Sequence, residues 1–549
     1  MGKFWGRSGE QRPPSSFLEH SLLLLPPSPS FFLHQWLSRR QFFWGSLTST
    51  SAQLLRGAPR PLIRLRAGFK VLPMTSHRML RSTSASRLRS SQSALGDGCH
   101  LLQRKRVKAT IQAKTLGPSC PQYEGNRSNV WLTDAPEFII TPRDFQSEEC
   151  LNLNVWAPLD KCRGEQSKKD LLPVLVWIYG GGFATGGPTV PYQVPARWVE
   201  RSGEHIVVGI TYRVNIFGFP NARALKSGEQ NLGLLDQRLA VEWIRDNIRN
   251  FGGDPSRITL WGQSAGAISV DNYNFAYPED PIASGYIMNS GNSLLRLQSN
   301  DVQHTNFTFV AKHFGCNTTT GESEIECLRG VSSVDIEKFL KQYSDSGKAP
   351  SLSFVQVVDN RTFFSNPTER TLAGNFSRKP AIIGTTDNEG SAFVPFSTTQ
   401  APNRTAADRF TADLFLCPAV QTTSSRYKAN ATTFRYLYSG NFSNIAPRPW
   451  EGACHSSDLP MYFGTYGIAR GNGTQLERET SERMQDFYLA FAKDPVNGLP
   501  DMGWDAYEPE GEALLIAHGG QAIQKISQSK LESPCDGVKP NGKPLPPNN

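Results

Sequence analysis

The chain has 549 residues, of which 38% are hydrophobic and 19% charged, a composition typical of a globular protein rich in turns. Its net charge of +9 comes from one end, since residues 1–110 carry 18 Lys and Arg against 3 Asp and Glu, whereas the rest carries 40 against 46. A basic folded surface for nucleic acid is therefore not expected, and the absence of any run of 18 or more apolar residues excludes a membrane-spanning helix on length.

Residues 1–107 differ in composition from everything that follows. They are rich in Arg, Ser and Pro, contain almost no acidic residues and show no sustained apolar period. Such a segment cannot bury enough apolar surface to offset the entropy lost on ordering. An organellar transit peptide has a similar composition, whereas a secretory signal with a clean apolar core is not recognisable. We predict that 1–107 is disordered or stems from a wrongly assigned gene start, and that 108–549 form the folded domain.

Three apolar runs predict strands of a parallel sheet. Residues 173–179, 205–212 and 258–262 are continuous and rich in β-branched and aromatic side chains, which is typical of strands buried on both faces. Between the last two, residues 231–251 carry apolar side chains at helical spacing, followed by a Gly-Gly-Asp-Pro stop signal. A strand, a helix and a strand in this order predict a right-handed crossover onto a parallel sheet.

The central motif is Gly-Gln-Ser-Ala-Gly at residues 262–266. By itself this GxSxG pattern is weak, because it arises by chance roughly once in five chains of this length. Here it follows a predicted strand and precedes a helix-compatible segment, which is the context of a nucleophile elbow. Ser264 would occupy the strained turn, and the following helix N-terminus would direct N–H groups at developing negative charge. The motif predicts Ser264 as a nucleophile.

A glycine triplet follows the first of these strands, at residues 180–182. Alone, it would be interpreted as a flexible turn. Upstream of GxSxG it matches an oxyanion-hole loop, whose backbone can approach a substrate oxygen because no side chain intervenes. We predict that the N–H groups of Gly181, Gly182 and Ala265 are the oxyanion donors.

At the level of longer motifs, the sequence resembles the type-B carboxylesterase/lipase family, which includes the cholinesterases. The matching stretches are SEECLNLN (147–154), VWIYGGGF (176–183), TYRVNIFGF (211–219) and the run from 231 to 266. GQSAGA followed by NYNFAYPEDPIASG is most similar to secreted filamentous-fungal members. The resemblance covers roughly residues 108–507 and implies an α/β-hydrolase fold, with a large, mostly parallel central sheet flanked by helices. The family's usual first strands are not recognisable in residues 1–107.

The resemblance also implies the partners of Ser264. The acid of the family lies in a Gly-x-x-x-Asp-Glu-Gly turn, which here ends in Asn388-Glu389-Gly390, so Glu389 is implied, with Asn388 in place of the usual Asp. The histidine precedes Leu-Pro and Phe-Gly, which implies His455. Such a triad cleaves carboxylic esters through an acyl-enzyme. It needs neither a metal nor an organic cofactor, and its partner is a small-molecule or lipid-like ester.

Nine cysteines occur without any CxxC pair, which makes zinc knuckles and thioredoxin-type motifs unexpected. The resemblance implies a Cys120–Cys150 disulfide, closing a loop that overhangs the site, and a Cys316–Cys327 disulfide. Cys417 and Cys454 are a further candidate pair that would brace the loop bearing His455. The pairing of the other three stays open, with Cys162 and Cys535 in polar stretches that look exposed and Cys99 in the 1–107 segment.

Nine Asn-x-Ser/Thr sequons favour a secreted glycoprotein. Chance supplies several in a chain of this length, but nine of them alongside short-range cysteine pairs indicate an oxidising, glycosylating route. The alternative is chance matches and buried thiols. The candidate glycosylation sites are Asn126, Asn306, Asn317, Asn360, Asn375, Asn403, Asn430, Asn441 and Asn472.

Other interpretations of the same fold are a catalytically inactive chain and an adhesion or ligand-binding protein. Binding relatives typically lack the nucleophile or the histidine, and both are present here. A cholinesterase would need an aromatic cation site in the Cys120–Cys150 loop, where Trp131 has the wrong spacing. A lipase would have a longer, more apolar lid than this polar loop. We therefore expect a general esterase, and leave the natural substrate and the oligomeric state open.

Overall fold

The structure is a computed structural model, and it describes residues 70–72, 113, 115–126, 128–139, 146–158, 170–295, 297–316 and 319–536. Of the predicted N-terminal segment 1–107 it describes only Lys70–Leu72, which form a strand. The rest of that segment lies outside the described residues, so its lack of a folded domain stays a prediction. Cys99, Cys162 and Asn317 lie outside the described residues as well.

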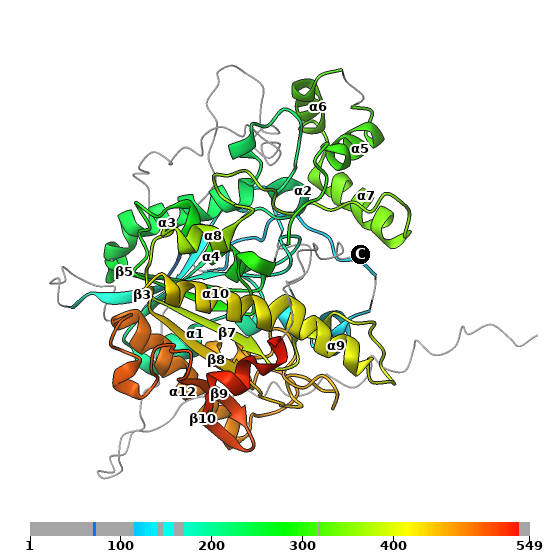
Figure 1. Cartoon of the computed structure of the whole chain (residues 1–549). Coiled ribbons are helices and arrows are strands. Elements are labelled where there is room, and N and C mark those ends of the chain that lie inside the picture. The colour runs from blue at the N-terminus through cyan, green and yellow to red at the C-terminus, as the bar shows by residue number, and fades with distance from the viewer. Residues whose placement is uncertain are drawn as a thin grey trace, which may run out of the picture. The chain divides into compact units, whose positions relative to one another are not determined.

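A ten-stranded sheet organises the described part of the chain (Figure 1). Its strand order is β1-β2-β4-β3-β5-β6-β7-β8-β9-β10. The strands from β4 to β9 in this order pair in parallel, and β1, β2 and β10 are antiparallel to their neighbours. The strands are β1 (Lys70–Leu72), β2 (Leu153–Trp156), β3 (Leu172–Ile178), β4 (Ile206–Ile210), β5 (Gly253–Gln263), β6 (Gly285–Asn289), β7 (Ala381–Thr386), β8 (Thr433–Tyr438), β9 (Glu512–His518) and β10 (Gln521–Ser527).

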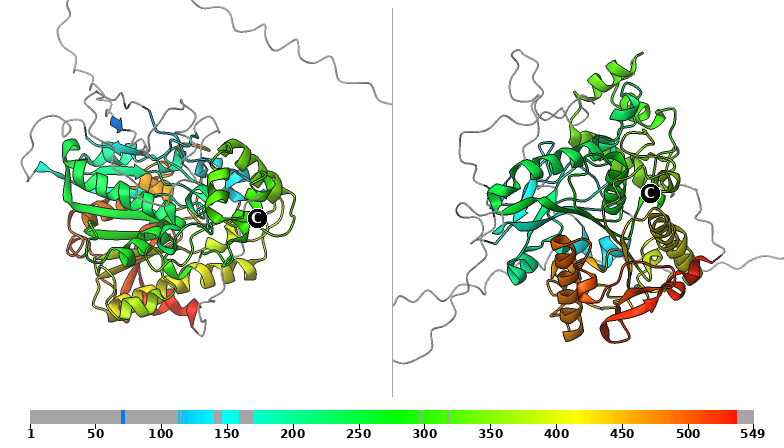
Figure 2. Two further views of the ribbon diagram at one scale, coloured as in Figure 1. Left: turned by 90° about the horizontal axis from the view of Figure 1, so that it is seen from above. Right: turned by 60° about the vertical axis from the view of Figure 1, so that its left-hand side comes forward.

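Helices cover both faces of this sheet (Figures 1 and 2). Helices α3, α4 and α10 pack on one face and α12 on the other, whereas α5, α6 and α7 form a separate group with its own apolar cluster. The α-helices are α1 (Ala196–Ser202), α2 (Asn215–Gly218), α3 (Leu232–Asn247), α4 (Ala265–Ala276), α5 (Thr305–His313), α6 (Gly321–Leu328), α7 (Ser333–Asp345), α8 (Pro367–Leu372), α9 (Arg404–Phe410), α10 (Cys417–Lys428), α11 (Leu459–Phe463), α12 (Gln475–Lys493) and α13 (Gln528–Glu532).

Short 3₁₀- and π-helices connect these elements. The two π-helices are η2 (Val130–Asp134) and η12 (Thr411–Leu416). The 3₁₀-helices are η3 (Pro136–Phe138), η7 (Pro191–Gln193), η8 (Ser227–Glu229), η9 (Ile248–Phe251), η10 (Ser293–Leu295), η11 (Glu389–Ala392), η13 (Pro500–Met502) and η14 (Ser533–Cys535). None of the described helices is both long and apolar enough to cross a membrane.

The apolar runs form the central strands, as predicted. Strand β3 is buried along its whole length, and so is β4, because helices cover both faces of the sheet there. The predicted helix over 231–251 is observed as α3 followed by η9. Helix α3 lies between β4 and β5 in the chain, and both of these strands pair in parallel with β3. The prediction of a mostly parallel sheet flanked by helices is confirmed.

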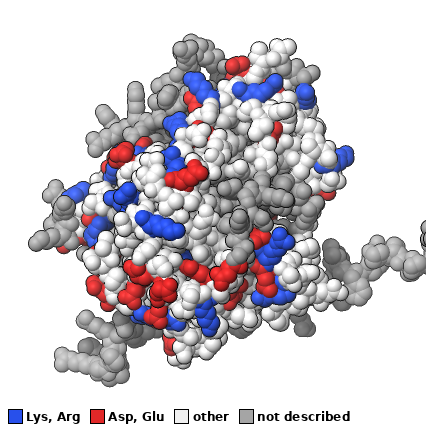
Figure 3. Space-filling model, in the orientation of Figure 1, with Lys and Arg blue, Asp and Glu red and all other residues white. Residues whose placement is uncertain are grey.

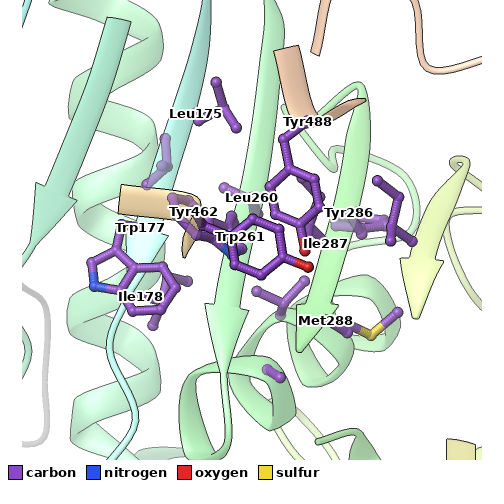
Figure 4. Packing of buried hydrophobic residues seen from close by; sticks show 14 of the residues in the cluster. Leu175, Trp177, Ile178, Leu260, Trp261, Tyr286, Ile287, Met288, Tyr462 and Tyr488 are labelled. Atoms are coloured by element: carbon purple, nitrogen blue, oxygen red, sulfur yellow. The ribbon is translucent and has the colours of Figure 1, made fainter. Parts of the chain in front are cut away.

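A cluster of large aromatic side chains anchors β5 (Figure 4). The indole of Trp261 lies 4.5 Å from the ring of Trp177 on β3 and stacks at 4.7 Å on Phe463 of α11. Its edge faces Tyr488 of α12, at 5.7 Å between ring centres. A buried aromatic side chain removes about 150–250 Å² from water, which stabilises the fold by several kcal/mol at about 25 cal/mol per Å². The strand that ends at Gln263 is therefore held rigidly.

Three disulfides occur in the described chain. Two join Cys120 to Cys150 and Cys316 to Cys327, the pairs that the resemblance implies. The third joins Cys417, at the start of α10, to Cys535 in η14, 118 residues away. The candidate Cys417–Cys454 pairing is therefore wrong, and Cys535, whose pairing the sequence left open, is the partner of Cys417. Cys454 is a buried free thiol whose pKa is raised by desolvation.

An ionic cluster fastens the overhanging Cys120–Cys150 loop to the segment before His455. The guanidinium of Arg448 donates to both carboxylate oxygens of Asp134 in η2, with Nε–Oδ2 at 2.5 Å and Nη2–Oδ1 at 2.7 Å. The Arg448 backbone N–H donates to Glu451 Oε2 at 3.0 Å. Burial, together with a hydrogen bond to Asp134, raises the pKa of Glu451 to about 7, because the protonated carboxyl can donate to the Asp134 carboxylate.

On the face shown in Figure 3, the acidic and basic side chains of the described residues are interspersed. Those residues form no continuous basic surface on that face.

We predict that peptide mapping without reduction recovers a Cys417–Cys535 peptide and an unpaired Cys454. Because Cys454 is buried, iodoacetamide should modify it only after unfolding. Recovery of a Cys417–Cys454 peptide from the folded protein would contradict the observed pairing.

We also predict that the Glu451→Gln variant loses less stability than the wild type as the pH rises. The pKa of Glu451 is higher in the folded than in the unfolded protein, so its stabilising effect is complete below about 4.5 and is lost as the pH rises through about 7. Glutamine stays neutral and can still donate to Asp134. The stability of the variant relative to wild type should rise between pH 5 and 8, by up to about 3 kcal/mol.

The measurement is thermal unfolding across this pH range. Glu137→Gln serves as the matched control, because Glu137 lies in the same loop but pairs with Arg470 on a half-exposed surface. Parallel pH dependence in wild type and Glu451→Gln would show that the carboxyl pair does not titrate as described.

Candidate active site

Ser264 occupies a strained turn between β5 and α4. Its backbone angles are φ 54° and ψ −124°, in a region that side-chain-bearing residues rarely adopt. The turn is held by a hydrogen bond from the Ser264 N–H to the Asn289 carbonyl at 2.9 Å, at the end of neighbouring strand β6. The predicted strand, turn and helix around Ser264 are therefore observed, with Ser264 half-buried at the turn.

The two glycines of the motif are required by close backbone approach. A Cβ on Gly262 would lie 2.2 Å from the Gly266 carbonyl oxygen, and a Cβ on Gly266 would lie 2.0 Å from the Ile178 carbonyl oxygen. No side chain can occupy either position without moving the backbone. The tight packing of β5, α4 and β3 thus explains the GxSxG spacing.

The glycine triplet lies directly against this turn. A Cβ on Gly180 would lie 2.6 Å from the Gln263 carbonyl oxygen and 2.9 Å from Ser264 Cβ. Gly181 and Gly182 have positive φ angles of 107° and 64°. Ala265 is the first residue of α4, so its N–H has no acceptor within the helix. The three predicted oxyanion donors therefore lie on the two segments that meet at Ser264.

Glu389 and His455 meet in a buried hydrogen bond. His455 Nδ1–H donates to Glu389 Oε2 at 2.5 Å, and the side chains are 3% and 0% exposed. Glu389 Oε1 accepts from the Thr386 N–H at 2.8 Å, and Thr411 Oγ1 accepts from the N–H of Gly390 at 2.9 Å. These contacts orient the carboxylate, which in turn leaves the lone pair of His455 on Nε2.

The partner of this lone pair among the described residues is Gln263 and not Ser264. Gln263 Nε2 lies 3.1 Å from His455 Nε2 and donates to Ser456 Oγ at 2.9 Å. Gln263 directly precedes Ser264, so His455 lies beside the nucleophile turn without a hydrogen bond to the Ser264 hydroxyl. Contacts between a base and its nucleophile often tighten only when substrate is bound.

Aromatic rings surround the imidazole of His455. The ring centres of Phe415 in η12, Phe393 after η11 and Trp131 in η2 lie 4.7, 5.0 and 6.2 Å from it. The two phenylalanines could not be predicted from the sequence, because no motif or period marks them, and Trp131 was expected only as a candidate cation site. These rings keep water from three sides of the imidazole and strengthen its hydrogen bonds.

A second buried acid adjoins the site. Asp458 Oδ2 accepts from the Tyr436 hydroxyl at 3.2 Å and from Asn289 Nδ2 at 3.3 Å. Burial, together with the nearby charge of Glu389, raises the pKa of Asp458 to about 6. The described residues contain no group of three His, Cys, Asp or Glu side chains that could hold a metal ion.

Comparison with known proteins agrees with this geometry. The model of the carboxylesterase family matches residues 103–411 and 397–533. The chain is 43% identical over 448 residues to a chlorogenic acid esterase of Aspergillus niger, covering 79% of this chain and 85% of that protein. It is 42% identical over 454 residues to secreted lipase 5 of Gibberella zeae, covering 77% and 84%.

More distant relatives have the same kind of activity. A para-nitrobenzyl esterase of Bacillus subtilis is 28% identical over 460 residues, covering 76% of this chain and 87% of that protein. Because the family model spans most of the chain and the fungal relatives match along most of their length, this protein is a serine hydrolase of carboxylic esters with the α/β-hydrolase fold, and it belongs to the carboxylesterase family.

Proposed function

We propose that this esterase acts through a triad of Ser264, His455 and Glu389. The observation that supports this assignment best is the buried hydrogen bond from His455 Nδ1–H to Glu389 Oε2, beside the strained turn of Ser264. In the neutral imidazole, which a general base requires, this hydrogen bond keeps the proton on Nδ1 and the lone pair on Nε2.

In the proposed reaction, Ser264 Oγ attacks the carbonyl carbon of the ester while its proton passes to His455 Nε2. The tetrahedral intermediate collapses by breaking the bond to the alkoxy oxygen, which takes that proton and leaves as an alcohol. A water molecule then attacks the acyl-enzyme, with His455 again as the base, and releases the acid. Glu389 stays ionised throughout and stabilises the imidazolium.

The developing negative charge needs donors fixed in advance. We assign this role to the N–H groups of Gly181, Gly182 and Ala265, because the glycine loop contacts the Ser264 turn and Ala265 begins α4. Such a donor contributes about 2.7–4 kcal/mol to the stabilisation of a transition state.

The substrate is an ester whose acyl or alcohol group fits beside aromatic rings. Phe393 and Trp131 are partly buried next to His455. One relative is named as a chlorogenic acid esterase and another as a secreted lipase. We propose general esterase activity, because the Cys120–Cys150 loop is polar and is fastened by the Arg448–Asp134 pair.

We extend the proposal to a secreted glycoprotein, since a relative at 42% identity is a secreted lipase. Of the candidate sequons, Asn306 is buried and its Nδ2 donates to the Ser353 carbonyl at 3.1 Å, so a glycan would disrupt its packing. The exposed sequons are Asn126, Asn360, Asn375, Asn403, Asn430, Asn441 and Asn472.

We predict that Ser264→Ala lowers turnover of a p-nitrophenyl ester by about 10⁶-fold and leaves the unfolding midpoint close to that of wild type. A fluorophosphonate should label wild type at Ser264 and leave the variant unlabelled. Ser284→Ala is the control, because that hydroxyl donates to the Ile258 carbonyl in the middle of β5, away from the turn at Ser264. Labelling at another serine, with activity retained, would refute the assignment.

We predict that glycans occur among the exposed sequons and not at Asn306. Peptide-N-glycosidase treatment of the secreted protein in ¹⁸O water, followed by mass mapping, marks each occupied asparagine. A marked Asn306, or no marked site at all, would contradict this prediction.

A further inference from the structure

Gln263 contacts the base of the site although it belongs to no part of the triad. It is the last residue of β5, and its side chain is buried. Its Nε2 lies 3.1 Å from His455 Nε2 and 2.9 Å from Ser456 Oγ, residues that lie 192 and 193 positions further along the chain. Ser456 itself has a positive φ of 77°. A strained residue and a buried amide thus meet at the base.

Glu389 determines which atom is the donor in the contact between Gln263 and His455. Because the Glu389 carboxylate can only accept, His455 Nδ1 must carry the proton, and Nε2 of the neutral ring must accept. Only the NH₂ group of Gln263 can face an acceptor. With the neutral ring, the two N–H bonds of this amide are therefore directed at His455 Nε2 and Ser456 Oγ.

This contact has two chemical consequences. A donor to Nε2 stabilises the neutral imidazole and opposes the imidazolium, which would place two N–H groups against each other. In addition, Nε2 has a single lone pair, so Gln263 and the Ser264 hydroxyl compete for it. The amide must withdraw before Ser264 can transfer its proton.

We propose that Gln263 is a positioning residue that holds His455 neutral in the resting enzyme and releases Nε2 to Ser264 during catalysis. The inference rests on the proposed role of His455 as the base. Whatever the substrate is, Gln263, the residue before the nucleophile, sets the pH at which His455 can accept a proton.

The other groups around His455 do not supply this effect. Its charged neighbours are Glu389 and, within the same loop, Asp458, and both are acidic. The elements η2 and η12 and the residue after η11 present aromatic rings to it. Glu451 and Cys454 lie in the loop that precedes His455. Gln263 is the neutral donor among these contacts.

The test compares the pH dependence of kcat/KM for three variants. Gln263→Glu replaces the donor with a carboxylate that accepts from Nε2–H. The acid limb of the profile, which is the rise of kcat/KM with pH, should therefore move up by roughly 1–2 pH units, a 10- to 100-fold loss of kcat/KM at low pH. Gln263→Met keeps the length but removes the donor, so the limb should move up by about half a unit. Gln237→Met is the matched control.

Gln237 is suited to that role because it is a buried glutamine of α3 whose Nε2 donates to Ser269 Oγ at 3.0 Å and does not reach His455. Its variant should keep the wild-type limb. Histidine ¹⁵N spectra, with His455 assigned by its absence from His455→Gln, report the same titration directly and separate it from that of Asp458.

An acid limb in Gln263→Glu that coincides with wild type, or moves to lower pH, overturns the inference. If Gln263→Glu does not fold, Gln263→Met decides, and an unshifted limb there overturns it as well. Failure of the triad assignment would look different, since Ser264→Ala would then retain activity whatever the variants of Gln263 do.

Discussion

The close approach of three backbone segments at Ser264 is the constraint on which the site depends. Strand β5, helix α4 and the loop after β3 come so near that Gly180, Gly262 and Gly266 leave no room for a Cβ. This contact forces the Ser264 backbone into its strained conformation and directs both the glycine loop and the start of α4 at one point. The packing of Trp261, a residue of β5, against Trp177 and Phe463 holds the strand that leads into this strained turn.

The parallel sheet then gathers the remaining groups. Ser264 follows β5, Glu389 follows β7 and His455 lies in the loop after β8, and these strands end at the same edge because they run in parallel. Asn289, at the end of β6 between them, accepts from the Ser264 N–H and donates to Asp458. Sheet order therefore brings together residues that are far apart in the chain.

The surroundings of His455 suit the general base that we propose. Aromatic rings cover it, Glu389 fixes its tautomer, and Gln263 meets its lone pair. Burial makes each of these hydrogen bonds stronger than it would be in water and makes a missing partner costly. The Arg448–Asp134 pair extends this enclosure, because it fastens the loop that carries Trp131.

Local patterns were readable from the sequence alone. The buried strands, the α3 helix and the turn at Ser264 depend on neighbouring residues, so apolar period and glycine spacing predicted them. Glu389 and His455 came only from resemblance to a family, since a glutamate and a histidine have no local signature. Tertiary structure alone decided the contacts between distant segments, which are Cys417 with Cys535, Asp134 with Arg448 and Glu451, and Gln263 with His455. These pairs lie 118 or more positions apart, and side chains that meet only after the sheet has formed leave no periodic trace in the chain.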